Sequence, residues 1–246
     1  MKHYRIYFFI AFYALLLQGC KTYHVAREEV SSTRINESID ADSSVWATIQ
    51  PYKIELDAEM DRVLAYNTTM LEKGKPESTL TNWFSDVIMN QAEEVFDEPV
   101  AFAIQNYGGI RRTQLGAGNV TVGNVFELMP FDNEMVLLSM SGSEVRHLLD
   151  RMASVGGWPV SRELRFQIKD KKAVNITIRG EPLVADKKYG VVMPDYIANG
   201  GDGLKFLIDI DRVQKGVLIR DAVIRYLEMK ETIDDVSLDG RITIQS

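Results

Sequence analysis

Apolar residues recur at helical or strand spacing along most of the chain beyond about residue 45. Their positions near Ile54 to Leu64 predict a first helix, followed by an extended segment at 67–71. A second helix is predicted from Thr79, because Pro76 interrupts the chain before it and a strong apolar face follows. A third helix is expected at 143–152, and buried strands are expected at 99–104, 135–140, 164–168, 174–178 and 189–193.

Helices and strands thus interleave, which predicts a mixed α/β domain over residues 45–246. With 246 residues, of which 46% are hydrophobic, the chain can bury one sizeable core. The formal net charge of −7 argues against a nucleic-acid-binding protein, because such proteins usually present a basic face. Small anions can still bind at a local basic pocket.

The first residues resemble an export signal. Lys2 and Arg5 precede an apolar run at 6–17 that is short for a membrane span, so residues 1–19 are interpreted as a signal peptide. Leu17-Gln18-Gly19-Cys20 looks like the lipobox of bacterial lipoproteins, in which the cysteine receives lipid. We therefore expect attachment to a membrane of the bacterial cell envelope through Cys20, on the periplasmic or surface side. The alternative is a buried cysteine in an uncleaved helix.

Cys20 is the only cysteine, so the chain cannot form an intramolecular disulfide and its fold must depend on packing. The residues after it, up to Ser44, are polar and charged. Such a segment has too little apolar surface to fold. Residues 20–44 are interpreted as a lipid-anchored flexible tether.

Four stretches depart from what a plain core requires, and each lies at the end of a predicted element, where loops often carry binding groups. They are Glu77-Ser78-Thr79-Leu80-Thr81-Asn82-Trp83-Phe84-Ser85-Asp86, Asn106-Tyr107-Gly108-Gly109-Ile110-Arg111, Pro130-Phe131-Asp132-Asn133 and Asp195-Tyr196-Ile197-Ala198-Asn199-Gly200-Gly201-Asp202-Gly203. Any one of them alone is a weak signal, because Gly-Gly pairs are common in turns.

Together and in this order, the stretches resemble the C-terminal domain of the 5'-nucleotidase family. Its usual forms are E-S-x-L-G-N-L-x-x-D-A, N-G-G-G-I-R, P-F-G-N and G-G-D-G, and the resemblance spans about Val45 to Ile210. The resemblance implies a layered α/β/β/α sandwich with a ligand cleft at one edge. It also implies a nucleoside or nucleoside 5'-phosphate as the ligand.

Two aromatic residues are candidates for stacking on the two faces of a purine. Phe131 and Tyr196 both lie on predicted loops, and stacking on an aromatic ring contributes roughly 1–3 kcal/mol per base. Asn133 can read a base edge, and Asp202 can accept from sugar hydroxyls. The resemblance implies the same roles for these four residues. The alternative is that both rings belong to the core.

Arg111 and Asn106 are the candidates for the phosphate side. A guanidinium fits phosphate oxygens bidentately, and the neighbouring glycines allow close approach of a ligand. Both residues match family positions that touch this side of the nucleotide. The alternative for Arg111 is a solvated surface charge, which is our interpretation of Arg112.

The chain departs from the family pattern at several positions. Tyr107, Asp132 and Thr81 each replace a usual glycine, and Lys73 and Lys75 lie where the family often has arginines. Lysine keeps the charge but lacks the planar fork of arginine, which changes phosphate affinity and ligand choice.

Catalytic members of the family carry a metallophosphatase domain with D-x-H and G-N-H-E/D elements, and neither element occurs in this sequence. A two-metal centre needs many imidazole and carboxylate ligands. Of the three histidines, His3 lies in the signal and His24 in the tether, so only His147 remains, and we interpret it as a surface residue. The sequence therefore predicts no metal ligands and no catalytic residues in this chain.

The leading hypothesis is a recognition domain for nucleotide dephosphorylation that acts with a separate metallophosphatase chain, which supplies the divalent metals. The isolated chain is predicted to be inactive. The alternative is a non-catalytic lipoprotein that binds nucleosides or nucleotides for uptake or sensing. A structural envelope protein with a degenerate fold is the third option.

Overall fold

The computed structural model describes residues 31–32, 34, 36, 39–40 and 42–245. The chain divides into two units, residues 1–48 and 49–246. The described part of the first unit includes the start of a helix, where Asp42 caps the first turn by accepting from the backbone N–H groups of Ser44 and Val45. The signal peptide and Cys20 lie outside the described residues. In the part of the chain that is described, no helix is long and apolar enough to span a bilayer.

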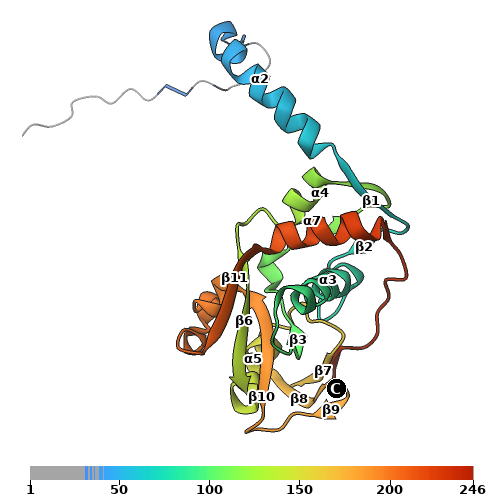
Figure 1. The fold of residues 1–246 in the computed structure, drawn as a ribbon, viewed down its shortest axis with the longest axis vertical. Helices are drawn as coiled ribbons and strands as arrows, with labels where there is room; N and C mark the ends of the chain where they lie inside the picture. The colour runs from blue at the N-terminus through green and yellow to red at the C-terminus, as the bar shows by residue number, and fades with distance from the viewer. Residues whose placement is uncertain (1–30, 33, 35, 37–38, 41, 246) are drawn as a thin grey trace, which may run out of the picture. The chain divides into compact units, whose positions relative to one another are not determined.

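Helices are distributed along the whole described chain (Figure 1). They are α2 (Ser43–Met60), α3 (Thr79–Val95), α4 (Val122–Leu128), α5 (Gly142–Ser154), α6 (Asp195–Ala198) and α7 (Ile219–Lys230). Short 3₁₀ turns occupy Tyr107–Gly109, Gly201–Gly203 and Lys205–Leu207. α2 begins at Ser43, within the last two residues of the expected tether.

The strands form two larger and two smaller sheets. The central sheet has the order β11 (Arg212–Leu218), β6 (Glu134–Ser141), β10 (Lys188–Pro194), β3 (Phe102–Ala103). The second has the order β13 (Ile242–Ile244), β7 (Leu164–Lys169), β8 (Lys172–Ile178), β9 (Glu181–Pro182). The smaller sheets are β12 (Thr232–Ile233), β1 (Val63–Asn67), β5 (Gly118–Thr121), and β2 (Leu71–Glu72) with β4 (Gln114–Leu115).

The central sheet separates two apolar cores, because its strands are apolar on both faces. On β6, Met135 and Leu137 pack into a core with α3 and α7, whereas Val136 and Leu138 pack into a core with α5 and the second sheet. Figure 1 shows α3 and α7 close together beside the sheet. The expected mixed α/β fold, with several sheets and helices, is confirmed.

The expected helix through Leu64 is wrong in its last residues. α2 ends at Met60, and Val63–Asn67 forms β1, which pairs with β5 and with β12. β12 lies near the other end of the chain, so local spacing could not indicate this pairing. The strand expected at 99–104 is also shorter, since only Phe102–Ala103 pairs continuously with β10.

The helix predicted from Thr79 is confirmed as α3, and its start explains one departure from the family pattern. Ser78 is the N-cap, its hydroxyl accepts from the backbone N–H of Thr81, and the Thr81 hydroxyl accepts from the backbone N–H of Ser78. This reciprocal capping satisfies donors that a helix start leaves unpaired. Thr81 therefore gives the helix start a contact that glycine cannot make.

The C-terminal segment 234–241 is held against α3 by residues of the first motif. Glu77 accepts from the backbone N–H groups of Asp239 and Gly240 at 2.8 and 3.2 Å, and the Asn82 amide donates to the Ser237 carbonyl at 3.1 Å. Asp86 binds the guanidinium of Arg241 at 2.9 and 3.1 Å. The polar residues of this motif therefore fasten the chain end.

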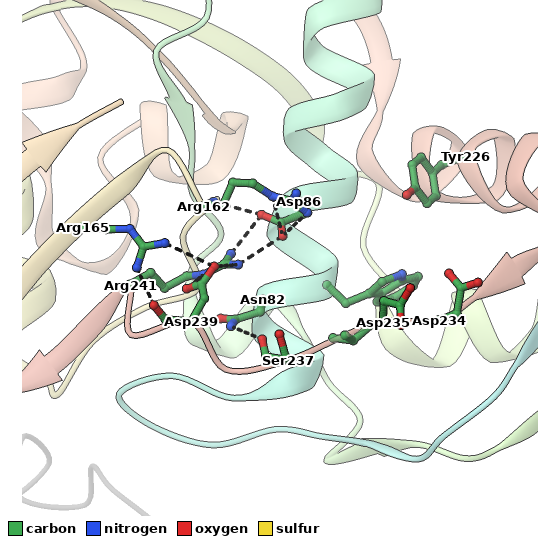
Figure 2. Close-up of a pocket in the computed structure, with 12 residues that line it drawn as sticks. Asn82, Asp86, Arg162, Arg165, Tyr226, Asp234, Asp235, Ser237, Asp239 and Arg241 are labelled. Atoms are coloured by element: carbon green, nitrogen blue, oxygen red, sulfur yellow. Dashed lines mark hydrogen bonds and ion pairs between the residues drawn. The ribbon is translucent and has the colours of Figure 1, made fainter. Parts of the chain in front are cut away.

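Figure 2 shows this contact region, which surrounds a cavity of about 290 Å³. Its charged groups largely satisfy one another: Arg241 is bound by Asp86 and Asp239, and Arg162 also reaches Asp86. Burial opposes the charge of Arg241, but its hydrogen bonds with Asp239 and Asp86 outweigh this and raise its pKa. None of the six predicted ligand residues lines this cavity. We interpret it as a structural clamp.

Replacing Arg241 should destabilise the protein far more than replacing Arg162, although both bind Asp86. The Arg241 side chain is 3% exposed and that of Arg162 is 67% exposed. We expect Arg241→Met to lower the free energy of unfolding by about 3 kcal/mol, because buried hydrogen-bonded charges lose their partner. Arg162→Ala should cost about 1 kcal/mol or less. Urea unfolding measures both, and equal losses would contradict the clamp.

Candidate functional site

Asp202 forms hydrogen bonds with two of the other predicted ligand residues, Asn106 and Tyr196. Its carboxylate accepts from the Asn106 amide at 3.3 Å and from the Tyr196 hydroxyl at 3.2 Å. Its backbone has the left-handed φ of 51°, and its carbonyl accepts from Arg151 Nε at 3.1 Å. Few non-glycine residues adopt this backbone conformation, and in it the Asp202 carboxylate reaches both Asn106 and Tyr196.

Gly201 allows the Tyr196 ring to lie close against this turn. A Cβ atom at position 201 would lie 2.5 Å from the Tyr196 carbonyl oxygen and 2.6 Å from Cε1 of its ring. Any larger residue would therefore displace the ring. The Gly-Gly-Asp-Gly stretch thus has a steric reason for glycine at its second position.

Asp195 joins Tyr196 to the loop that carries Phe131. One oxygen of Asp195 accepts from the Asn133 amide at 2.8 Å, from the backbone N–H of Glu134 at 3.2 Å and from that of Tyr196 at 2.7 Å. This carboxylate therefore holds the Phe131 segment against the start of α6, and the predicted loop position of Tyr196 is wrong, because Tyr196 lies in that short helix. Asp195 belongs to the fourth motif, but no local pattern indicated this role.

Both candidate rings are accessible. Phe131 is 39% exposed and Tyr196 is 46% exposed, so the alternative that they are core aromatics is wrong. Asn133 uses its amide N–H on Asp195, and Asp202 has both carboxylate oxygens engaged within the protein. A ligand that contacts these groups would share or replace these hydrogen bonds. The ligand roles of all six residues stay predictions.

Three cations lie beside aromatic rings of the predicted motifs. Arg111 Cζ is 5.8 Å from the centroid of the Phe131 ring, and the amines of Lys73 and Lys75 lie 4.0 and 4.6 Å from that of Tyr107. Within the described residues, none of the three pairs with a carboxylate. Burial, together with the charges of Arg111 and Lys75, lowers the pKa of Lys73, and burial also lowers that of Lys75. Such a cluster of unpaired cations favours an anionic ligand.

His147 is exposed, as predicted, and its ring stacks on Phe206 at a centroid distance of 4.2 Å. In the region that the structure describes, no three histidine, cysteine or acidic side chains come together as metal ligands. The site that the described residues build is therefore one of aromatic rings, amides, a carboxylate and cations.

Comparisons with known proteins identify relatives of this domain. A family model described as "5'-nucleotidase, C-terminal domain" matches residues 58–209. The chain is 29% identical over 204 residues to a 5'-nucleotidase of Rattus norvegicus, covering 71% of this chain and 35% of the relative. It is 35% identical over 106 residues to Protein UshA of Escherichia coli, covering 42% of this chain and 19% of that protein.

Solved structures agree with this assignment. The crystal structure of a 5'-nucleotidase precursor from Thermus thermophilus matches with a TM-score of 0.70 and 29% identity, covering 82% of this chain and 42% of that one. The NAD nucleotidase of Haemophilus influenzae matches in fold, with a TM-score of 0.64 and 21% identity, covering 85% of this chain and 42% of that one. This chain spans about a third of the length of the rat relative and less than half of the T. thermophilus protein.

As the pH rises, anion binding by the cluster of Lys73, Lys75 and Arg111 should begin to weaken at a lower pH than it would if the two lysines had ordinary pKa values. The lowered pKa values of Lys73 and Lys75 mean that both amines lose their proton, and with it their attraction for an anion, before an ordinary lysine does. We expect the affinity for inorganic phosphate, measured by calorimetry, to fall as the pH rises through these lowered values.

The matched control is the double variant Lys73→Arg, Lys75→Arg, whose guanidinium groups stay charged over the same range. Both proteins should carry Tyr107→Phe, which removes the phenol hydroxyl beside the two amines and keeps the ring. Superimposable pH profiles would contradict the role of the lysines.

Proposed function

Because the chain belongs to the 5'-nucleotidase C-terminal domain family, we propose that it recognises the nucleoside part of a nucleotide for phosphate-ester hydrolysis by a separate metallophosphatase chain. The observation that carries this proposal is the hydrogen-bonded network of Asn106, Tyr196 and Asp202. Asp195, next to Tyr196, holds the loop with the exposed Phe131 ring beside this network. A nucleotide is the ligand whose chemical parts match these groups.

The base stacks on the exposed rings of Phe131 and Tyr196, and stacking contributes roughly 1–3 kcal/mol per base. The ribose hydroxyls donate to Asp202, whose carboxylate already accepts from neutral donors. The phosphate lies towards Arg111 and Lys73, which have no carboxylate partner among the described residues. Recognition thus combines stacking of the base, hydrogen bonds to the ribose and charge attraction to the phosphate.

The proposal assigns the divalent metals to the partner chain, because the sequence contains neither metal-binding element of the catalytic half. This chain then contributes positioning, which lowers the barrier by fixing the substrate relative to the metals. The lipid that we propose on Cys20 would keep both chains at one membrane of the cell envelope. The mass of the N-terminal peptide of the exported protein would show or exclude that lipid.

Ligand binding by the full chain should separate the base contacts from the phosphate contact. We expect Phe131→Ala and Tyr196→Ala each to weaken adenosine binding about fivefold to 150-fold, from the loss of base stacking. Arg111→Ala should weaken AMP binding and leave adenosine unchanged, because adenosine has no phosphate. Arg112→Ala is the control, since that exposed residue pairs with Glu127. Isothermal calorimetry gives the affinities, and equal values in all variants would refute the assignment.

Phosphate release from AMP tests the two-chain enzyme. The full chain is mixed with a metallophosphatase chain encoded beside it, and we expect a higher kcat/KM than with the partner alone. Tyr196→Ala should reduce this gain, because substrate positioning depends on that ring. If there is no gain but adenosine still binds, the alternative of a nucleoside-binding lipoprotein for uptake or sensing stands. If there is neither gain nor binding, the structural envelope protein remains.

A further inference from the structure

The loop that carries Phe131 is held by the first two residues of α7. We define the Phe131 loop as residues 130–133. The backbone N–H of Ile219 donates to the Asn133 carbonyl at 2.9 Å. Arg220, the next residue, reaches the middle of the loop from the same helix start. The loop is thereby fastened at two adjacent positions.

Arg220 makes three contacts around the loop. Its guanidinium forms an ion pair with Asp132 at 2.6 Å, donates to the Phe131 carbonyl at 3.4 Å and lies 4.1 Å from the Phe126 ring centroid. The Arg220 side chain is 9% exposed and that of Asp132 is 79% exposed. A nearly buried, planar guanidinium thus binds the backbone and the side chain of successive loop residues.

We propose that Arg220 is a positioning residue that fixes the Phe131 ring as a platform for the base. The inference rests on the proposed function, since it assigns Phe131 to that role. Asp132 stands where the family motif usually has glycine, so this ion pair depends on a residue that departs from the usual pattern. A loop that is ordered before the ligand arrives loses less freedom on binding, and this raises affinity.

The ion pair acts more directly on the base contact than on the phosphate contact. Arg220 touches the loop backbone and Asp132, whereas Lys73 and Lys75 lie beside the Tyr107 ring and only Arg111, 5.8 Å from the Phe131 ring centroid, is a neighbour of the loop among these three cations. A change at Arg220 or Asp132 should therefore weaken the binding of ligands that carry a base more than that of ligands that lack one. A general structural role would weaken the binding of both kinds of ligand equally.

The test compares adenosine with ribose 5-phosphate by calorimetry on the full chain. We expect Asp132→Asn and Arg220→Met each to raise the Kd for adenosine about fivefold to tenfold, because the loop must then be ordered when the ligand binds. Arg220→Lys should restore part of the affinity. The Kd for ribose 5-phosphate should change clearly less than that for adenosine. In a Phe131→Ala background, Asp132→Asn should have no further effect.

Arg225→Met is the matched control, because Arg225 is an exposed arginine of the same helix with no hydrogen bond or ion pair in the described structure. If Arg220→Met fails to fold, Asp132→Asn decides, since the exposed Asp132 side chain contributes little to folding. Equal losses for adenosine and ribose 5-phosphate, or no loss in either variant, would overturn the inference.

Amide hydrogen exchange of the peptide that covers the Phe131 loop separates this inference from the proposed function. We expect faster exchange in Asp132→Asn than in the wild type, and no change in Arg225→Met. If the wild type does not bind adenosine, the proposed function fails, and the exchange rates still decide whether Arg220 orders the loop. Unchanged exchange in Asp132→Asn would show that it does not.

Discussion

The buried ion pair between Arg241 and Asp86 ties the segment that joins the two cores to α3, in addition to the central sheet that both cores share. The segment 234–241 leaves β12, which pairs with β1 beside the α3 and α7 core, and leads to β13, which pairs with β7 in the second sheet. Asp86 of α3 binds Arg241 of this segment, so α3 holds the segment that leads from one core to the other. Removing one partner is costly because it leaves the other charge buried without compensation.

In the candidate site, acidic side chains also join segments that are distant in sequence. Asp195 and Asp202 each collect donors from segments distant in sequence, Asp195 from the Phe131 loop and Asp202 from Asn106. Both acidic residues follow β10, a strand with a neighbour on each side in the central sheet, so a fixed strand positions two turns. Ligand-binding side chains on loops gain precision when the strand before them is held in this way.

Local patterns predicted much of the fold, and distant partners account for most of what they missed. α3, α5, β6 and β10 follow from apolar periodicity, because their own spacing determines which face is buried. β1 was missed because its partner β12 lies far along the chain. Asp86 and Arg241, 155 positions apart, give no sign of each other in sequence. Arg220 likewise looks like an ordinary helical charge until the fold buries it.

The three replacements of a usual glycine all make contacts within the protein. Here Thr81 completes the cap of α3, Asp132 pairs with Arg220, and Tyr107 receives the amines of Lys73 and Lys75. Each replacement of a usual glycine has thus gained a contact that glycine cannot make. Thr81 stabilises the start of α3, whereas Asp132 and Tyr107 lie on segments of the proposed ligand site.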